Sequence, residues 1–340
     1  MAGVRVVWGE PTRDEASAPL LARMRCWLNR RTPPEPVEQM VLHWARVYPG
    51  NVQTRDKTSH TGGQLVLDAE FGLTSASWCV MDGRRTLPTD VDIHAPAGTL
   101  AGDHYFLGSV HPHFGHSLLE GLSRTWAWEG FAAAHPEGRA VIHEPWTPDF
   151  AMALLLFAGV DTERLFRPEG PTIVERLHVP SLSAFSHRWI TAEQTRIWQR
   201  IGDAVQLEQR SGRRVYLSRR GVASRRLETE AEVENVFSRA GFEIVRPETL
   251  PINEQIRMAR QSDVLAGCTG SQMYLAVFQP AGATTLILAP DNFFLPDDTL
   301  IAEAMDHRLA VAFGGSSAYR MPQGPWSIDP KAAEALIATL

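Results

Sequence analysis

The sequence predicts an α/β protein with a parallel sheet, and the pattern of its second half carries that prediction. Four short apolar segments with strand composition occur at 214–217, 242–245, 263–266 and 284–289. Amphipathic segments with helical spacing separate them, and the connecting turns are short. Strands that alternate with helices in this way form right-handed βαβ units and hence a parallel sheet. With 340 residues, the chain is long enough for two domains of ordinary size.

Each helix of the second half has local signals of its own. Thr229–Glu232 fits a capping box, and the helix that it begins ends at Gly241. A second helix is expected over Ile252–Arg260, because the apolar residues of that segment share one face. The turn Gly267–Ser271, which reads GCTGS, leads into a third helix that runs through Phe278.

The first half has weaker signals. Strands are expected at 4–8, 64–67 and 140–143, and a helix is expected at about His116–Ala133. The apolar run Phe150–Val160 is too short for a membrane span, which needs roughly 20 residues, and predicts a buried helix instead.

The predicted domain boundaries follow from these elements. Residues 1–190 are expected to form an N-terminal α/β domain, and a polar helical bridge follows at 191–210. Residues 211–320 are expected to form the second α/β domain, and 321–340 carry a tail helix.

The composition excludes several classes of protein. The chain is 44% hydrophobic and 21% charged, which is ordinary for a globular protein, and its net charge of −6 argues against nucleic acid as a partner. Cys26, Cys79 and Cys268 form no CxxC pair, which fits a reducing compartment. The N-terminus shows no basic segment followed by an apolar one. We therefore expect a soluble, cytoplasmic protein without a transmembrane segment, and a homo-oligomer is compatible with the sequence.

Arginine dominates the basic residues, since the 33 of them include only two lysines. Genome composition accounts for most of this bias. Six arginines, however, fall between 213 and 226, in and after the first strand of the second half. Arg219 directly follows the carboxyl end of that strand, where a planar guanidinium suits phosphate binding. For Arg213 and Arg214, a solvated basic surface is an equal alternative.

The GCTGS turn at Gly267–Ser271 has features of a ligand-binding loop. Its two glycines let the backbone approach a ligand closely, and the helix that follows offers free N–H groups. Taken alone, the turn fits a plain strand-to-helix connection better. Because this turn and the arginine loop both follow strands of one parallel sheet, we expect them to face the same crevice.

Three histidines, His111, His113 and His116, fall within six residues. They are compatible with a metal site, so a His-dependent metal hydrolase is one alternative function. No cysteine or aspartate stands nearby at ligand spacing, however. His116 and Glu120 are four residues apart and would share one helix face. A histidine held by a carboxylate suits a general base, because its pKa lies near working pH.

Three stretches of sequence occur in the order of a known family's motifs. The first, HFGHSLLEGLSRTWAW, is followed by VYLSRRGVASRRLETE and then by GFEIVRPETLPINEQIRMARQSDVLAGCTGSQMYLAVFQPAGATTLIL. Together they resemble the core of glycosyltransferase family 61, over roughly Tyr105–Ala289.

The resemblance implies a GT-B architecture, in which two Rossmann-like domains with parallel sheets face a central cleft. It also implies an inverting, metal-independent transfer of a hexosyl or pentosyl group from a nucleotide sugar, with UDP as the expected nucleotide. The acceptor would be a glycan, a lipid-linked intermediate or another hydroxyl compound in polysaccharide or glycoconjugate biosynthesis. No cofactor is implied besides the nucleotide sugar as co-substrate.

The resemblance also places individual residues. It puts His116 near the acceptor and the anomeric carbon. We assign His116 as the base with Glu120 as its orienting partner or substitute, and we place His111 and His113 on the acceptor side. Around the donor nucleotide the resemblance puts a larger set, which comprises Arg219, Arg225, Arg226, Glu230, Glu254, Gln255, Gly267, Thr269, Gly270 and Ser271.

Three positions depart from the family's pattern. Thr229 stands where asparagine is usual, Thr269 stands where histidine is frequent, and Tyr274 stands where a TN pair or a histidine is usual. These replacements fall in the implied nucleotide site. They are also compatible with a non-catalytic relative that binds a nucleotide or a glycan, which is a third function to consider.

Overall fold

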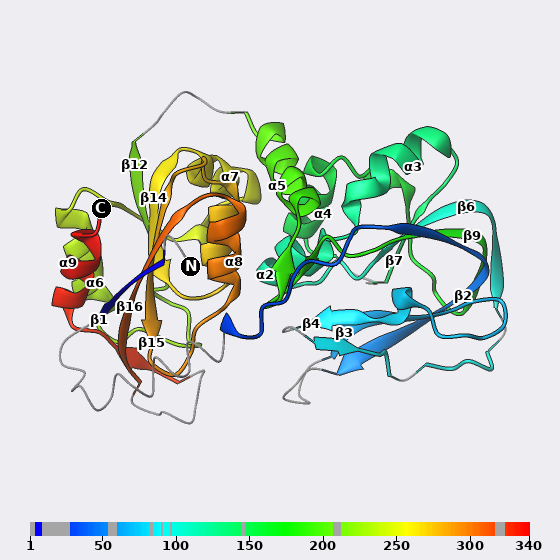
Figure 1. Ribbon diagram of the computed structural model, residues 1–340, viewed down its shortest axis with the longest axis horizontal. Helices are drawn as coiled ribbons and strands as arrows, with labels where there is room; N and C mark the ends of the chain where they lie inside the picture. Colours follow the sequence, from blue (N-terminus) through cyan, green and yellow to red (C-terminus); the bar gives the residue numbers. More distant parts are fainter. Residues whose placement is uncertain are drawn as a thin grey trace. The chain divides into compact units, whose positions relative to one another are not determined.

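The computed structural model describes residues 4–8, 28–53, 60–81, 84–89, 91–95, 97–143, 147–206, 212–316 and 324–340. The chain divides into two compact units, one of residues 33–204 and one of residues 1–32 together with 205–340. Each unit consists of one main sheet and the helices packed on it (Figure 1). No helix in the described ranges is both long and apolar enough to span a bilayer.

The unit that contains the C-terminus is built on a parallel sheet. Its strands are β1 (Val4–Trp8), β12 (Arg213–Leu217), β13 (Glu243–Val245), β14 (Ser262–Cys268), β15 (Thr284–Pro290), β16 (Arg308–Ser316) and β17 (Trp326–Ser327). The order across the sheet is β13–β12–β14–β15–β16–β1, and each neighbouring pair is parallel. Only β17 is antiparallel, and it pairs with β16. The predicted parallel sheet is therefore confirmed for this half of the chain.

Helices cover both faces of this sheet, with α6 and α9 on one side and α7 and α8 on the other (Figure 1). They are α6 (Glu230–Arg239), the 3₁₀ turn η5 (Pro247–Thr249), α7 (Ile252–Arg260), the 3₁₀ helix η6 (Ser271–Phe278), α8 (Asp297–Ala304) and α9 (Pro330–Ile337). Phe237 of α6 and Leu336 of α9 are fully buried against apolar strand residues such as Leu286.

The strand order creates a topological switch point at β12. The chain leaves β12 to form β13 on one side and then returns to form β14 on the other side. Connections on the two sides of such a strand diverge, and in parallel sheets the carboxyl ends of such strands are the usual place for a ligand. The arginine loop and the GCTGS turn follow these two strands.

The boundaries of the units differ from the predicted domains at the N-terminus and at the predicted bridge. The expected domain 1–190 begins with β1, but β1 pairs with β16 in the sheet of the other unit. This pairing satisfies backbone groups of β16 that would otherwise form an open sheet edge. Such a contact between the two ends of a chain has no local sequence signal. Residues 321–323 of the predicted tail lie outside the described residues.

The predicted bridge at 191–210 contains α5 (Ala192–Ala204), which belongs to the unit 33–204. Its Trp198 is fully buried and donates a hydrogen bond from Nε1 to the carbonyl of Leu118 (3.0 Å). The helix is thus packed into this unit. Residues 207–210 of the predicted bridge lie outside the described part of the chain.

The unit 33–204 has a mixed sheet, so the prediction of a parallel sheet is wrong for this half. Its strands are β2 (Gln39–Gln53), β3 (His60–Leu67), β6 (Gly98–Gly108), β7 (Ala140–Ile142), β8 (Leu165–Phe166) and β9 (Thr172–Pro180). The order is β3–β2–β9–β6–β7–β8, and β2 is antiparallel to both of its neighbours. The strands from β9 to β8 are parallel. Two small hairpins pair β4 (Cys79–Met81) with β5 (Arg84–Thr86) and β10 (Ala184–Phe185) with β11 (Trp189–Ile190).

The predicted helix from His116 to Ala133 is broken into short pieces. They are α2 (Phe114–His116), the π-helical turn η2 (Ser117–Gly121), the 3₁₀ turn η3 (Thr125–Ala127) and α3 (Trp128–Ala134). The hydroxyls of Ser123 and Thr125 donate to the carbonyls three residues earlier, at 2.7 and 2.9 Å, and so compete with regular helical bonds. Gly121 also packs tightly, since a Cβ there would lie 2.5 Å from the Val110 carbonyl oxygen.

The remaining helices of this unit are η1 (Ser75–Ser77), α4 (Asp149–Phe157) and η4 (Thr162–Arg164). The strand β6 is the switch point of the sheet, because β7 pairs on one side of it and β9 on the other. The segment with the three histidines follows the carboxyl end of β6.

Candidate active site

His111 anchors the loop that follows β6. Its side chain is buried, and its backbone has a φ of 60°, which is uncommon for a residue other than glycine. The Ser117 hydroxyl donates to the His111 carbonyl (2.6 Å), so the first turn after the loop holds this conformation in place. A strained residue that its surroundings fix in this way is frequent at functional sites.

His116 and Glu120 form the contact that their spacing predicts. The His116 Nδ1 lies 3.2 Å from the Glu120 Oε2. The carboxylate is buried, with 3% of its side chain exposed, whereas 29% of the His116 side chain is exposed. The turn that carries Glu120 is π-helical, and such turns are frequent at functional sites. The buried carboxylate orients the imidazole through Nδ1, so Nε2 is the nitrogen that would exchange a proton with a ligand.

The other two histidines lie next to this pair. The ring centroids of His111 and His113 are 5.6 and 6.2 Å from that of His116. Burial lowers the pKa of His111 to about 4, and burial together with the charge of His116 lowers the pKa of His113. Both rings are therefore neutral near pH 7.

The buried His111 makes stability depend on pH. The unfolded chain binds a proton at this residue near pH 6.5, whereas the folded protein binds one only near pH 4. The folded protein is therefore at its most stable, as far as His111 is concerned, above pH 6.5. Part of its free energy of unfolding is lost as the pH falls from 6.5 towards 4. The loss reaches about 3 kcal/mol at most, from 1.36 kcal/mol per pKa unit.

We expect His111→Asn to reduce this slope, because asparagine tolerates a positive φ and does not titrate. Thermal unfolding midpoints of both proteins between pH 4 and pH 7 provide the measurement. Equal slopes in the two proteins would show that His111 is not responsible. The lowered pKa values of His104 and His113 also make the protein less stable at low pH. The contribution of His111 is therefore the difference between the slopes of the wild type and of His111→Asn.

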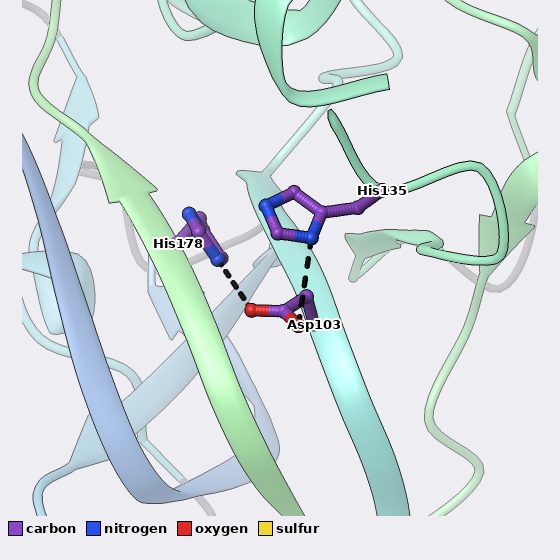
Figure 2. A group of neighbouring side chains, drawn as sticks. All are labelled: Asp103, His135 and His178. Atoms are coloured by element: carbon purple, nitrogen blue, oxygen red, sulfur yellow. Dashed lines mark hydrogen bonds and ion pairs between the residues drawn. The ribbon is translucent and has the colours of Figure 1, made fainter. Parts of the chain in front are cut away.

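A second group of polar side chains has the spacing of a metal site. Ligand atoms of Asp103, His135 and His178 all lie within 4.8 Å of one another (Figure 2). Arg176 already occupies this carboxylate, since its Nε and Nη2 donate to the two Asp103 oxygens at 3.0 and 2.9 Å. His178 Nε2 adds a third contact to Asp103, at 2.8 Å. The negative charge of Asp103 is thus balanced by side chains of the same chain. The group connects β6, β9 and the end of α3.

We expect Asp103→Asn to destabilise the fold by about 1.5 kcal/mol, the lower end of the range for hydrogen bonds to charged groups, since the site is partly exposed. The hydrogen bond from Arg176 holds the pKa of the Asp103 carboxyl well below its usual range. The ionised Asp103 therefore contributes to the stability of the fold above about pH 4, and this contribution is lost as the pH falls further. Urea unfolding at pH 7 measures the difference, and an unchanged midpoint would contradict this role.

The alternative metal site at His111, His113 and His116 does not have comparable geometry. In the part of the chain that the structure describes, the Asp103 group is the only set of three such side chains with ligand atoms this close. His111 is also buried behind the loop.

In the other unit, two arginines and a glycine meet at the switch point between β12 and β14. A Cβ on Gly270 would lie 3.0 Å from the Nη1 of Arg219 and 3.6 Å from the Nη2 of Arg225. The φ of Gly270 is 152°, a conformation that other residues rarely adopt. The arginine loop and the GCTGS turn therefore lie next to each other, as their positions after neighbouring strands predict.

Arg219 is held rigidly within this group. It is 7% exposed, and its Nη2 donates to the Ser224 carbonyl at 2.9 Å. Its backbone N–H donates to the Glu230 Oε1 at 2.5 Å. Glu230 is itself buried, and burial raises its pKa. Glu230 therefore positions the arginine loop from behind.

Arg225 completes the pair. Its guanidinium lies over the Phe293 ring, 4.4 Å from the centroid, and its backbone φ is 51°. Burial and the charge of Arg219 lower the pKa of Arg225 to about 10. Two guanidinium groups that repel each other in a partly buried place favour an anion between them.

The structure does not bring all predicted donor residues to this point. The Arg226 side chain is 63% exposed and pairs with Glu228. Glu254 pairs with Arg257 on its own helix, and Gln255 donates to the Leu250 carbonyl at 2.9 Å. These contacts are local.

The glycines and Ser271 have separate places in the turn. Gly267 lies within β14 and is close to the Leu217 carbonyl, 3.0 Å from where a Cβ would be. Ser271 is exposed at the start of η6. The predicted capping role of Thr229 is wrong. Its hydroxyl instead donates to the Ile328 carbonyl at 3.0 Å and makes no capping bond to α6.

Two buried acids at the start of α8 contact the turn and the helix η6 that follows it, and the sequence patterns did not indicate them. The Thr269 hydroxyl lies 3.5 Å from Asp298, and the Tyr274 hydroxyl donates to Asp297 at 3.1 Å. Burial and the neighbouring Asp297 raise the pKa of Asp298 well above its usual value. Two of the three positions that depart from the family pattern, Thr269 and Tyr274, thus have polar partners within this chain.

The fold and these contacts define an α/β protein in which two arginine side chains lie beside a glycine turn at the switch point of a parallel sheet. The family model of glycosyltransferase 61 matches residues 114–287, about half of the chain. The protein therefore belongs to glycosyltransferase family 61. Comparison with curated proteins gives no match.

Two solved structures are distantly similar. The dodecameric iron-containing heptosyltransferase TibC, in complex with ADP-D-beta-D-heptose, is 11% identical, with 79% of this chain and 81% of that chain covered and a TM-score of 0.32. The iron-containing dodecameric glycosyltransferase TibC from enterotoxigenic E. coli H10407 is 11% identical, with 78% and 81% covered and a TM-score of 0.28. Likeness at this level supports no inference about this chain.

Proposed function

We propose that this glycosyltransferase takes its sugar from a nucleotide sugar whose diphosphate binds between Arg219 and Arg225. The convergence of both guanidinium groups on Gly270, at the switch point of a parallel sheet, carries the proposal. A diphosphate needs several strong donors, and guanidinium groups supply them in fixed geometry. Gly270 would let the phosphates come close to the backbone.

The same groups would stabilise the leaving group. As the bond to the sugar breaks, the diphosphate gains negative charge, which preorganised arginines offset without needing to move. The helix η6 begins at Ser271, directly after this turn, and backbone N–H groups at its start would add to this stabilisation. This supports a metal-independent reaction with a diphosphate nucleotide such as UDP.

We further propose that His116 acts as the general base. An acceptor hydroxyl is a poor nucleophile near neutral pH and must lose its proton as it attacks. The acceptor oxygen would bond to the anomeric carbon as the bond to the diphosphate breaks, and the proton would pass to His116. Glu120 would orient the ring and stabilise the imidazolium that forms. Displacement in one step inverts the anomeric centre.

The finer features of the reaction rest on the family resemblance. They are the transfer of a hexosyl or pentosyl group, a glycan, lipid-linked or other hydroxyl acceptor, and a role in polysaccharide or glycoconjugate biosynthesis. The GT-B arrangement, in which two units close over the substrates, is part of the same proposal. Closure would exclude water that otherwise hydrolyses the donor.

A thermal-shift screen tests the donor proposal. A ligand that binds only the folded protein stabilises it by about 2.7 kcal/mol at a hundred times its dissociation constant. We expect one nucleoside diphosphate and its sugar conjugate to raise the unfolding midpoint in the presence of EDTA, while the parent nucleoside does not. If no nucleotide of the panel changes the midpoint, the proposed donor site is wrong.

A further inference from the structure

A pocket beside the His116–Glu120 pair contains hydrogen-bond acceptors that lack donors. It lies at the carboxyl end of β6 within the unit 33–204, and Gln64, Trp78, Glu120 and Arg124 are among its lining residues. Gln64 and Trp78 precede residue 114, where the match to the family model begins. These two lining residues are therefore outside the segment that the family model matches.

Gln64 and Glu120 both line this pocket. The Gln64 Nε2 donates to the Ile142 carbonyl (3.4 Å), and the Glu120 Oε2 is occupied by His116. The other oxygen of each side chain is buried and has no hydrogen-bond partner among the described residues. The two residues are only 4% and 5% exposed. Leaving such an acceptor unsatisfied costs about 1–3 kcal/mol, so two of them in one pocket indicate a ligand that supplies donors.

The charges that line the pocket indicate which kind of donor fits. Arg124 is buried, its Nε donates to the Pro180 carbonyl at 3.2 Å, and its guanidinium lies 5.3 Å from the Phe106 ring centroid. Its positive charge balances that of Glu120, so the pocket has no net charge to attract an ion. A hydroxyl group fits this setting, because it can donate to the two oxygens and accept from the guanidinium. Half-buried Trp78 adds the aromatic surface that is common in small-molecule sites.

We propose that this pocket is an acceptor subsite, which binds a hydroxyl group of an uncharged saccharide next to the hydroxyl that His116 deprotonates. The link to catalysis rests on the proposed function, since Glu120 serves both the pocket and the base. The binding of the saccharide does not depend on that function. Gln64 is thereby a residue that determines which acceptor is bound.

Saturation-transfer NMR on the full-length protein tests the proposal, with methyl glycosides of glucose, galactose, mannose and xylose as probes. We expect at least one of them to bind, and we expect Gln64→Leu to weaken that binding at least tenfold. Glucosamine and inorganic phosphate carry charge. Any binding that they show should be equal in the wild type and in Gln64→Leu. The proposal is overturned if no methyl glycoside binds, if binding is equal in the variant, or if only the charged probes depend on Gln64.

A buried glutamine with a purely structural role provides the matched control. Gln194 is fully buried in the same unit, and both ends of its amide are bonded, to Ser183 at 2.7 Å and to the Leu118 carbonyl at 3.3 Å. Gln194→Leu should therefore lower the unfolding midpoint. Gln64→Leu should leave the midpoint nearly unchanged, because it removes an unsatisfied acceptor together with one long hydrogen bond (3.4 Å) to the Ile142 carbonyl. A midpoint that falls equally in both variants would assign Gln64 to the fold and contradict the subsite.

The two proposals can fail separately. If a nucleoside diphosphate stabilises the protein but no glycoside depends on Gln64, the subsite is wrong and the donor site stands. If a glycoside depends on Gln64 but no nucleotide binds, the subsite stands and the proposed donor chemistry is wrong.

Discussion

Replacing His116 by alanine should slow sugar transfer by about 10²–10⁴-fold, the usual contribution of a general base. The expectation follows from the contact between His116 Nδ1 and the buried Glu120, which fixes the ring while leaving it partly exposed to a ligand. The loss should appear in kcat at saturating donor, because the base acts on the acceptor proton during the chemical step. Donor affinity, measured by calorimetry, should stay unchanged.

Two further variants separate catalysis from structure. His113→Ala is the matched control, since this histidine belongs to the same cluster but has no contact with Glu120 that would orient it as a base. It should reduce kcat far less than His116→Ala. Glu120→Gln should retain the fold and lose part of the activity, because the amide orients the ring without stabilising its charged form. A His116→Ala protein with full kcat would remove this residue from the mechanism.

Replacing Arg219 by alanine should weaken the binding of the donor nucleotide by about 1.5–3 kcal/mol, the scale of hydrogen bonds to charged groups. This corresponds to a roughly 10- to 150-fold rise in Kd. The expectation rests on the buried position of Arg219 beside Gly270 and Arg225. Titration calorimetry with the stabilising nucleoside diphosphate measures it, and the affinity of wild type should fall with added salt.

Arg220→Ala provides the comparison for this variant. Arg220 belongs to the same loop, but its side chain is 48% exposed and pairs with Glu234 on α6. Its loss should leave nucleotide affinity within a factor of about two, since surface ion pairs contribute little. Equal affinity in wild type and Arg219→Ala, with an unchanged unfolding midpoint, would move the donor site elsewhere.

How far the sequence predicts this fold depends on how local its signals are. In the C-terminal half, strands alternate with amphipathic helices, so the segments around 252–260 and 284–289 are found almost where they were expected. The sheet of the other half depends on β2, a 15-residue strand that contains Pro49 and Gly50. One of its two antiparallel partners is the following strand β3, but the other, β9, lies far along the chain. The pairing of β1 with β16 is equally non-local.

The predicted site shows the same division. The contact between His116 and Glu120 follows from their spacing alone, and the meeting of the arginine loop with the GCTGS turn follows from strand topology. Gln64 stands in no motif, and only the pocket around it reveals its unsatisfied oxygen. Asp298 contacts Thr269 of the GCTGS turn and Asp297 contacts Tyr274 of η6, and both acids come from α8, further along the chain.

The stereochemistry of donor turnover tests the account most directly. The nucleotide sugar that stabilises the protein serves as the donor. Proton NMR can follow the anomeric configuration of the first product, which is the free sugar after hydrolysis or the glycoside after transfer to an acceptor. The account predicts that this sugar appears first as the anomer opposite to that of the donor, and that EDTA does not stop its release. First release with the donor's own anomeric configuration, or turnover that ends when the metal is chelated, would contradict it.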